Sequence, residues 1–129
     1  MRIRIALAIL AVATAMAGCT SQPIMNVNDA IVAVPAGKSV THAQVRDAIV
    51  RAGAALGWQI KDEGPNLLVG TLQLRTHTAV VEIPYSTSKF SIRYRSSINL
   101  DQNGGNIHKN YNGWIQNLTK GINDQLALL

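Results

Sequence analysis

Apolar residues recur at helical spacing in two stretches of the chain. In the first stretch they follow Thr41 along one helical face, at Val45, Ala48, Ile49, Ala52 and Leu56. Thr41 and Gln44 have the spacing of a capping box, in which each side chain accepts a hydrogen bond from the other residue's backbone amide. Gly57 suits the left-handed position that follows a helix. We therefore predict a helix over 41–56.

The second helical stretch is the end of the chain. Its apolar residues continue at spacings of three and four over about six turns. They are Ile107, Tyr111, Trp114, Ile115, Leu118, Ile122, Leu126 and Leu129. Gly113 and Gly121 lie off this stripe and weaken a helix by about 1 kcal/mol each relative to Ala, without breaking it. We predict a second helix over 107–129.

Between the helices, apolar and polar residues alternate with the period of two that is typical of half-buried strands. The alternation covers the segments 68–75, 79–85 and 90–95. An earlier β-branched stretch, Ala30–Val34, ends at a Pro-Ala-Gly turn and also suits a strand. The predicted fold is therefore α+β, in the order β-α-β-β-β-α, with an antiparallel sheet and two helices packed on one face.

The inward faces of these strands predict a register. A turn at 86–89 places apolar residues opposite one another: Tyr85 with Phe90, Ile83 with Ile92, and Val81 with Tyr94. Glu82 then lies opposite Arg93 on the other face, which is a favourable cross-strand pair. A turn at Thr76-His77 pairs Leu72 with Val81 and Leu68 with Tyr85. Thr-His is poor chemistry for a two-residue turn, so we expect the strands to curl or the loop to be wider.

The first residues follow a different pattern. Arg2 and Arg4 precede an apolar run over 5–17. This run of about 13 residues is shorter than the roughly 20 that a helix needs to cross a bilayer, so a secretory signal peptide is favoured over a permanent membrane helix.

The end of this run resembles the lipobox of bacterial lipoproteins, in which Leu, a small residue, and Gly or Ala precede Cys. Met16, Ala17 and Gly18 precede Cys19, with Met16 in place of Leu. We expect cleavage before Cys19 and a covalent lipid on its sulfur; the alternative is an ordinary cysteine near a plain cleavage site. Thr20 follows instead of the Asp that retains lipoproteins in the inner membrane, so we expect the periplasmic face of the outer membrane.

These assignments divide the chain into a signal peptide over 1–18, a lipidated tether over 19–28 and one periplasmic domain over 29–129. Lipidation would consume the only cysteine, so we expect no disulfide and no thiolate metal site. Without Arg2 and Arg4 the formal charge falls from +5 to about +3. This mild charge favours lipid headgroups over nucleic acid as an anionic partner.

The three histidines do not form a recognisable site in the sequence. His42 and His108 lie where the two helices begin, and His77 lies at a predicted turn. No pair has a metal-ligand spacing, and we expect neutral, structural imidazoles and no metal cofactor. An enzyme would require His77 and His108 to converge with Glu82 or Asp101, and we expect no catalytic residues.

The segment 101–105 is similar to the start of a calcium loop. Its fifth position is glycine, and its twelfth is Asn112 where a bidentate Glu is required. We therefore predict an ordinary glycine-containing loop.

Arginines mark the outward face of the predicted sheet. Arg75, Arg93 and Arg95 lie on this face, where guanidinium groups can bind phosphate or carboxylate in a bidentate manner. The two interpretations are a solvated polar face and a binding surface for a partner.

Four segments carry a wider resemblance. Residues 53–58 with 76–86, and 97–100 with the string Ile-His-Lys-Asn-Tyr-Asn-Gly-Trp at 107–114, resemble a family of small proteobacterial lipoproteins. The resemblance implies a location in the envelope and no reaction. It also implies a shared cluster, made of His77, Tyr85, Asn99, His108, Tyr111 and Trp114.

We expect a non-catalytic, outer-membrane-anchored interaction module with an envelope protein as partner. The alternative is a binder of a small ligand or an anionic headgroup, with a pocket around His108, Tyr85 and Tyr94 or on the arginine face. A pocket under the last helix would favour the ligand, and a flat polar sheet would favour the partner.

Overall fold

The computed structural model describes residues 20–129. Cys19 and the predicted signal peptide therefore lie outside the described residues. In the described part, the elements are β1 (Ser21–Pro23), β2 (Val27–Ile31), α1 (His42–Ala55), β3 (Trp58–Gly64), β4 (Leu67–Leu74), β5 (His77–Pro84), β6 (Lys89–Ile98), β7 (Asn106–His108) and α2 (Lys109–Ala127).

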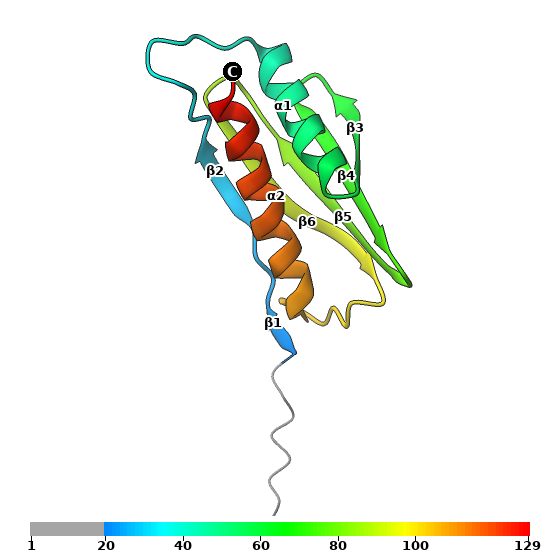
Figure 1. The fold of residues 1–129 in the computed structure, drawn as a ribbon. Helices are drawn as coiled ribbons and strands as arrows, with labels where there is room; N and C mark the ends of the chain where they lie inside the picture. The colour runs from blue at the N-terminus through cyan, green and yellow to red at the C-terminus, as the bar shows by residue number, and fades with distance from the viewer. Residues whose placement is uncertain (1–19) are drawn as a thin grey trace, which may run out of the picture.

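Five strands form an antiparallel sheet in the order β2-β6-β5-β4-β3, and β1 pairs with β7 in a separate two-stranded sheet. Both helices lie side by side on one face of the large sheet (Figure 1). The predicted α+β class and the packing of two helices on one face of an antiparallel sheet are confirmed.

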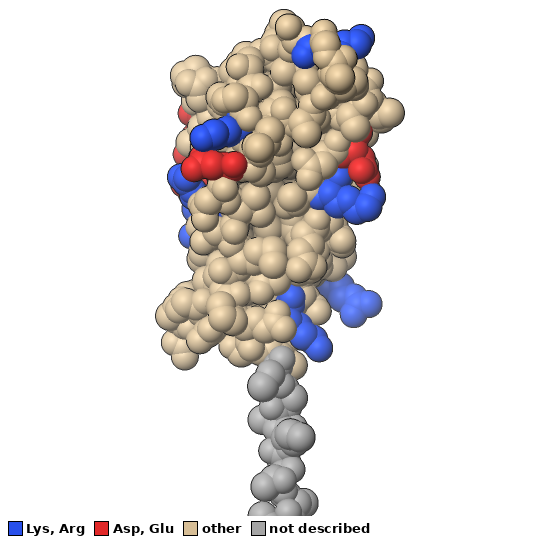
Figure 2. All heavy atoms as spheres, turned by 90° about the vertical axis from the view of Figure 1, so that its left-hand side faces the viewer, with Lys and Arg blue, Asp and Glu red and all other residues tan. Residues whose placement is uncertain are grey.

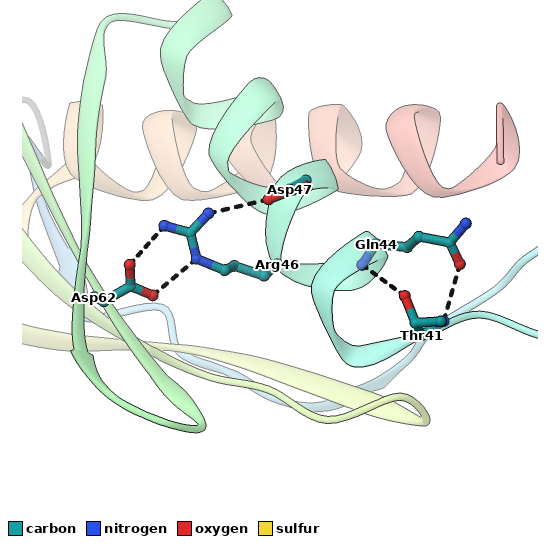
Figure 3. Close-up of polar contacts among 5 residues, drawn as sticks. All are labelled: Thr41, Gln44, Arg46, Asp47 and Asp62. Carbon is teal, nitrogen blue, oxygen red and sulfur yellow. Dashed lines mark hydrogen bonds and ion pairs between the residues drawn. The ribbon is translucent and has the colours of Figure 1, made fainter.

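The helix predictions hold to within a few residues. Thr41 caps α1 as predicted, because its hydroxyl accepts from the Gln44 amide at 3.1 Å and the Gln44 side chain accepts from the Thr41 amide at 2.9 Å (Figure 3). Gly57 follows α1 with φ of +88°. In α2 the predicted stripe supplies core residues, and Tyr111, Ile115, Leu118, Ile122 and Leu126 are fully buried.

The helices approach each other closely at small residues. A Cβ added at Gly121 of α2 would lie 3.5 Å from the Cβ of Ala52 in α1. Side chains of both helices and of the inward sheet face then form one core. Burial of this apolar surface is the main stabilising contribution to the fold.

The β5–β6 register is confirmed where the structure gives it. Val81 is paired with Tyr94, Glu82 with Arg93, and Tyr85 with Phe90. A bulge then shifts the register, so that Val80 lies opposite Ser96. The extra residue turns Ser97 toward Tyr94, whose hydroxyl lies 2.8 Å from the Ser97 hydroxyl.

The predicted β4–β5 register is wrong by two residues. Leu72 lies opposite Ala79 and Leu68 opposite Ile83, because the turn is at Arg75-Thr76. Arg75 takes a positive φ of 57°, which makes this tight turn possible without glycine. A slip of two residues keeps every side chain on its face, so alternation alone could not detect the error.

The predicted tether over 19–28 is not free where the structure describes it. Ser21–Pro23 forms β1, and β2 begins at Val27, three residues before the predicted start. Composition indicated a polar linker, but β1 pairs with β7, whose residues lie 83–87 positions away in the sequence. The strand β3 was also missed, because it is an edge strand whose centre is Lys61-Asp62-Glu63.

Candidate functional site

The face of the large sheet opposite the helices is open (Figure 1). On β4 the outward residues are Val69, Thr71 and Gln73, which alternate with buried or inward positions. On β6 this face includes Arg93 and Arg95, both exposed. This open face is the one that the sequence predicted to be either a solvated polar face or a binding surface for a partner.

Arg95 is already paired. Its Nη1 lies 2.6 Å from Glu63 Oε2 on β3, and its Nε lies 3.7 Å from Glu82 Oε1 on β5. The hydrogen bond to Glu63 raises the pKa of Arg95 above its ordinary value. Glu82 of β5 is paired with Arg93 of β6, as predicted, but the Glu82 carboxylate is nearer to Arg95. The bulge between β5 and β6 accounts for this change.

The three predicted arginines do not form one surface. Arg93 donates from Nε to Asn28 Oδ1 at 3.3 Å, and Arg95 lies two residues further along the same strand. Arg75 lies in the β4–β5 turn at the end of the sheet. In the view onto the β2 edge, Lys and Arg side chains are scattered and form no continuous patch (Figure 2).

A shallow hollow of about 280 Å³ lies at the other end of the open face. Its charged residues are Asp29, Lys89 and Arg93, and the side of Tyr85 also contributes. Two cations and one anion leave the hollow with a small net positive charge. This hollow could receive a small anionic group on its two cations.

An ion pair joins α1 to the edge strand β3. Arg46 donates from Nε to Asp62 Oδ1 at 2.8 Å and from Nη2 to Asp62 Oδ2, and Nη1 donates to Asp47 at 3.0 Å (Figure 3). The bond from Arg46 lowers the pKa of the Asp62 carboxyl. This exposed cluster connects two elements, and Asp62 also lines a hollow of about 280 Å³ beside β3 and β4.

His42 and Tyr85 form a stacked pair near this cluster. Their ring centroids are 4.5 Å apart, and His42 Nε2 is buried without a hydrogen-bond partner among the described residues. Burial raises the pKa of the Tyr85 phenol. The pair closes the core where α1 begins, which is a structural role.

The side chains of the predicted shared cluster lie at two ends of the sheet. Tyr85 lies beyond the last residue of β5, whereas His77 is the first residue of that strand. His77 and Asn99 meet, because His77 Nδ1 lies 2.5 Å from Asn99 O. Asn99 also donates from Nδ2 to Thr76 Oγ1 at 2.7 Å.

His108 caps α2 as the sequence placed it. Its Nδ1 accepts from the Asn110 amide at 3.2 Å, and its own amide donates to Leu100 O at 2.8 Å. An accepting Nδ1 is unprotonated, so this cap uses a neutral imidazole. The His77 imidazole is bonded to the Asn99 carbonyl and the His108 imidazole to the Asn110 amide, and neither has a hydrogen bond to Glu82 or Asp101.

The space under α2 is filled by side chains. Tyr111 is fully buried and packs edge-on against Tyr94, with ring centroids 5.6 Å apart. Trp114 is partly buried against the same core. The expected ligand pocket has three lining residues, Tyr85, Tyr94 and His108. In the structure, each of the three lies in different surroundings.

Asn112 is an important residue that the sequence analysis did not identify. Its Oδ1 accepts from the Met25 amide at 2.9 Å, and its Nδ2 donates to Pro23 O at 2.9 Å. These bonds hold the segment after β1 against α2. An asparagine beside an apolar stripe was the only available signal, and it does not reveal a partner that is 89 residues away.

Within residues 20–129, no three His, Cys, Asp or Glu side chains are grouped so that they could hold a metal ion. In the same range, no helix has both the length and the apolar character to cross a bilayer. The loop over 101–106 is closed by backbone bonds between Asn103 and Asn106, both of 3.0 Å.

Comparison with known proteins finds no matching family model, no matching curated protein and no matching solved structure. The resemblance to small proteobacterial lipoproteins therefore stays a prediction.

Proposed function

We propose that this protein is a non-catalytic, lipid-anchored interaction module on the periplasmic face of the outer membrane. The observation that carries the proposal is the open sheet face, because two helices cover only one side of a five-stranded sheet. The sequence before Cys19 supports the anchor, and the open, mixed-charge face supports a protein partner.

The anchor and the face would work together. A lipid on Cys19 confines the protein to a surface and raises its effective concentration there, so a weak protein contact is sufficient for function. Outward residues such as Thr71 and Arg93 would contact the partner. The paired charges of Arg95, Glu63 and Glu82 favour a polar contact over an apolar one.

Site-specific crosslinking in cells tests the partner. A photo-crosslinking residue at Thr71, on the open face, should trap a specific envelope protein that mass spectrometry identifies. The same residue at Gln116, which is exposed on α2, is the matched control. Equal products from both positions would contradict a contact through the sheet face.

Charge reversal adds a second criterion. Arg93→Glu should reduce the crosslink, whereas Arg51→Glu on α1 should leave it unchanged, because Arg51 bonds Gln125 on the helical side. Loss of the product in both variants would indicate a general charge effect and not a surface-specific contact.

The anchor has its own test. Cys19→Ser should move the protein from the membrane fraction to the soluble periplasmic fraction, and mass spectrometry of the wild-type protein should show the lipid. Retention of the Cys19→Ser protein in the membrane fraction would mean that the lipobox interpretation is wrong.

The second candidate is a binder of a small anion or headgroup, which the hollow around Lys89 and Arg93 favours. A crosslink from Thr71 to lipid alone, or a ligand lost with Lys89→Gln, would favour this function over a protein partner.

A further inference from the structure

The described part of the chain begins at Thr20, directly after the predicted lipid attachment site. The Thr20 carbonyl accepts from the Lys109 amide at 2.6 Å, and Ser21 pairs with His108. A few residues further along, the Asn112 side chain bonds to the Pro23 carbonyl and the Met25 amide. Adjacent Cα atoms are about 3.8 Å apart, so a lipid on Cys19 would have almost no tether between it and the domain.

Hydrogen bonds connect the start of α2, where Thr20 and β1 are bound, to the β4–β5 hairpin. The His108 amide binds Leu100 O, next to Asn99. Asn99 in turn binds Thr76 and His77 at the β4–β5 turn. The turn, the loop over 99–106, β1 and the start of α2 therefore lie at one end of the molecule (Figure 1).

Two large apolar side chains are exposed at this end. Leu74 is 48% exposed and Ile98 is 65% exposed. Leu74 pairs with His77 and Ile98 with Thr78, so they lie on neighbouring positions of the sheet. By strand alternation, with Ser97 turned inward, they lie on opposite faces. Both side chains would contact an apolar medium at the same time only if this end of the sheet faced that medium.

The charges of this end are few. The segments 74–78 and 98–109 contain Arg75 and Lys109 as cations and Asp101 as the one carboxylate. On the face shown in Figure 2, the charged side chains at the lower end are Lys or Arg. This composition suits anionic headgroups, and the two apolar side chains suit the interface beneath them.

We propose that this end of the domain docks on the membrane surface, with Leu74 and Ile98 in the interfacial layer and Arg75 and Lys109 at lipid phosphates. The large sheet then stands on the membrane and presents its open face sideways. The proposal rests on the lipid anchor of the proposed function. It assigns a role to the hydrogen bonds of His77, Asn99 and His108, which build the docking end.

Depth-dependent fluorescence quenching on the lipidated, full-length protein tests this orientation. The lipid occupies the Cys19 sulfur, so an introduced cysteine is the single free thiol. A fluorophore on Leu74→Cys is compared with one on Lys38→Cys, which lies in the loop before α1 at the opposite end (Figure 1). The vesicles contain phosphatidylethanolamine, phosphatidylglycerol and a lipid with a quencher near its headgroup.

We expect strong quenching at position 74 and little at position 38. Ile98→Ser should reduce the quenching at position 74, whereas Leu128→Ser, at another exposed apolar residue, should not. Vesicles without phosphatidylglycerol should give weaker quenching if Arg75 and Lys109 bind anionic lipid.

Equal quenching at positions 74 and 38 in protein whose mass includes the lipid would overturn the docking proposal and leave the anchor intact. Protein without the lipid mass would overturn both the anchor and the docking that rests on it. The mass of the sample therefore separates the two failures.

Discussion

At the scale of single residues, Asn112 shows how one side chain can replace strand pairing. It is 7% exposed, and its amide satisfies a backbone donor and a backbone acceptor of the segment after β1. Backbone groups that lose their partners in a buried setting destabilise the folded state strongly. Asn112 is thus the residue that joins the start of the domain to its last helix.

Asn112→Ala should lower the free energy of unfolding by about 1–2 kcal/mol, because Met25 N–H and Pro23 C=O would lose their partners, and water can replace only the bond at the exposed Pro23. Urea unfolding followed by circular dichroism measures the loss. Asn123→Ala, at an exposed position of the same helix, is the control and should change little. If Asn112→Ala lowers the free energy of unfolding no more than the control does, β1 is held mainly by β7.

Tyr111 presents the opposite case. Its ring is fully buried, but its hydroxyl has no hydrogen-bond partner among the described residues, and burial raises the pKa of the phenol. Tyr111→Phe keeps the ring and removes the unpartnered hydroxyl, so stability should stay equal or rise by up to about 1 kcal/mol. A loss above that amount in thermal unfolding would reveal an unrecognised partner of the hydroxyl.

At the scale of elements, two helical glycines should respond to Ala in opposite directions. Gly113 in α2 has nothing within 4 Å of an added Cβ, whereas at Gly53 in α1 the Cβ would lie 2.6 Å from Ile60 Cγ1. Gly113→Ala should stabilise the protein by about 0.5–1 kcal/mol through helix propensity. Gly53→Ala should destabilise it by about 1–2 kcal/mol, because the clash with β3 exceeds that gain.

Chemical denaturation of both variants tests this pair. The wild-type protein is the common reference, and unchanged m-values would show that the denatured state is comparable. Stabilisation by both substitutions would mean that Ile60 moves aside freely and that α1 does not depend on close contact with β3 at this point.

The contact between α1 and β3 also has a pH signature. Arg46 depresses the pKa of Asp62, so the pair stabilises the fold above the unfolded pKa of Asp62 and this contribution is lost as the pH falls through the folded value. NMR titration should show an Asp62 pKa below the usual range, and Arg46→Met should raise it. An unchanged Asp62 pKa in Arg46→Met would contradict the ion pair in solution.

At the scale of the whole molecule, the arrangement of the two ends follows from the topology. The β1–β7 pairing brings Thr20 to the end that holds the β4–β5 turn and the loop over 99–106. The open sheet face runs between this end and the α1 capping region. A lipid on Cys19, next to Thr20, and a partner on the sheet face would therefore use different surfaces of one domain.

The sequence by itself determined the local elements whose signals are local. The capping box, the two apolar stripes and the alternation in β4, β5 and β6 predicted the helices, these three strands and the α+β class, because burial of a face imposes its period on consecutive residues. The signal before Cys19 is equally local, and it remains a prediction.

Only the tertiary structure decided what depends on distant partners. The β4–β5 register is a choice between slips of two residues, which alternation cannot distinguish. The pairing of β1 with β7 and the bonds of Asn112 to Pro23 and Met25 both join residues far apart in the chain. Such contacts form when the core closes, so the composition of either segment alone contains no record of them.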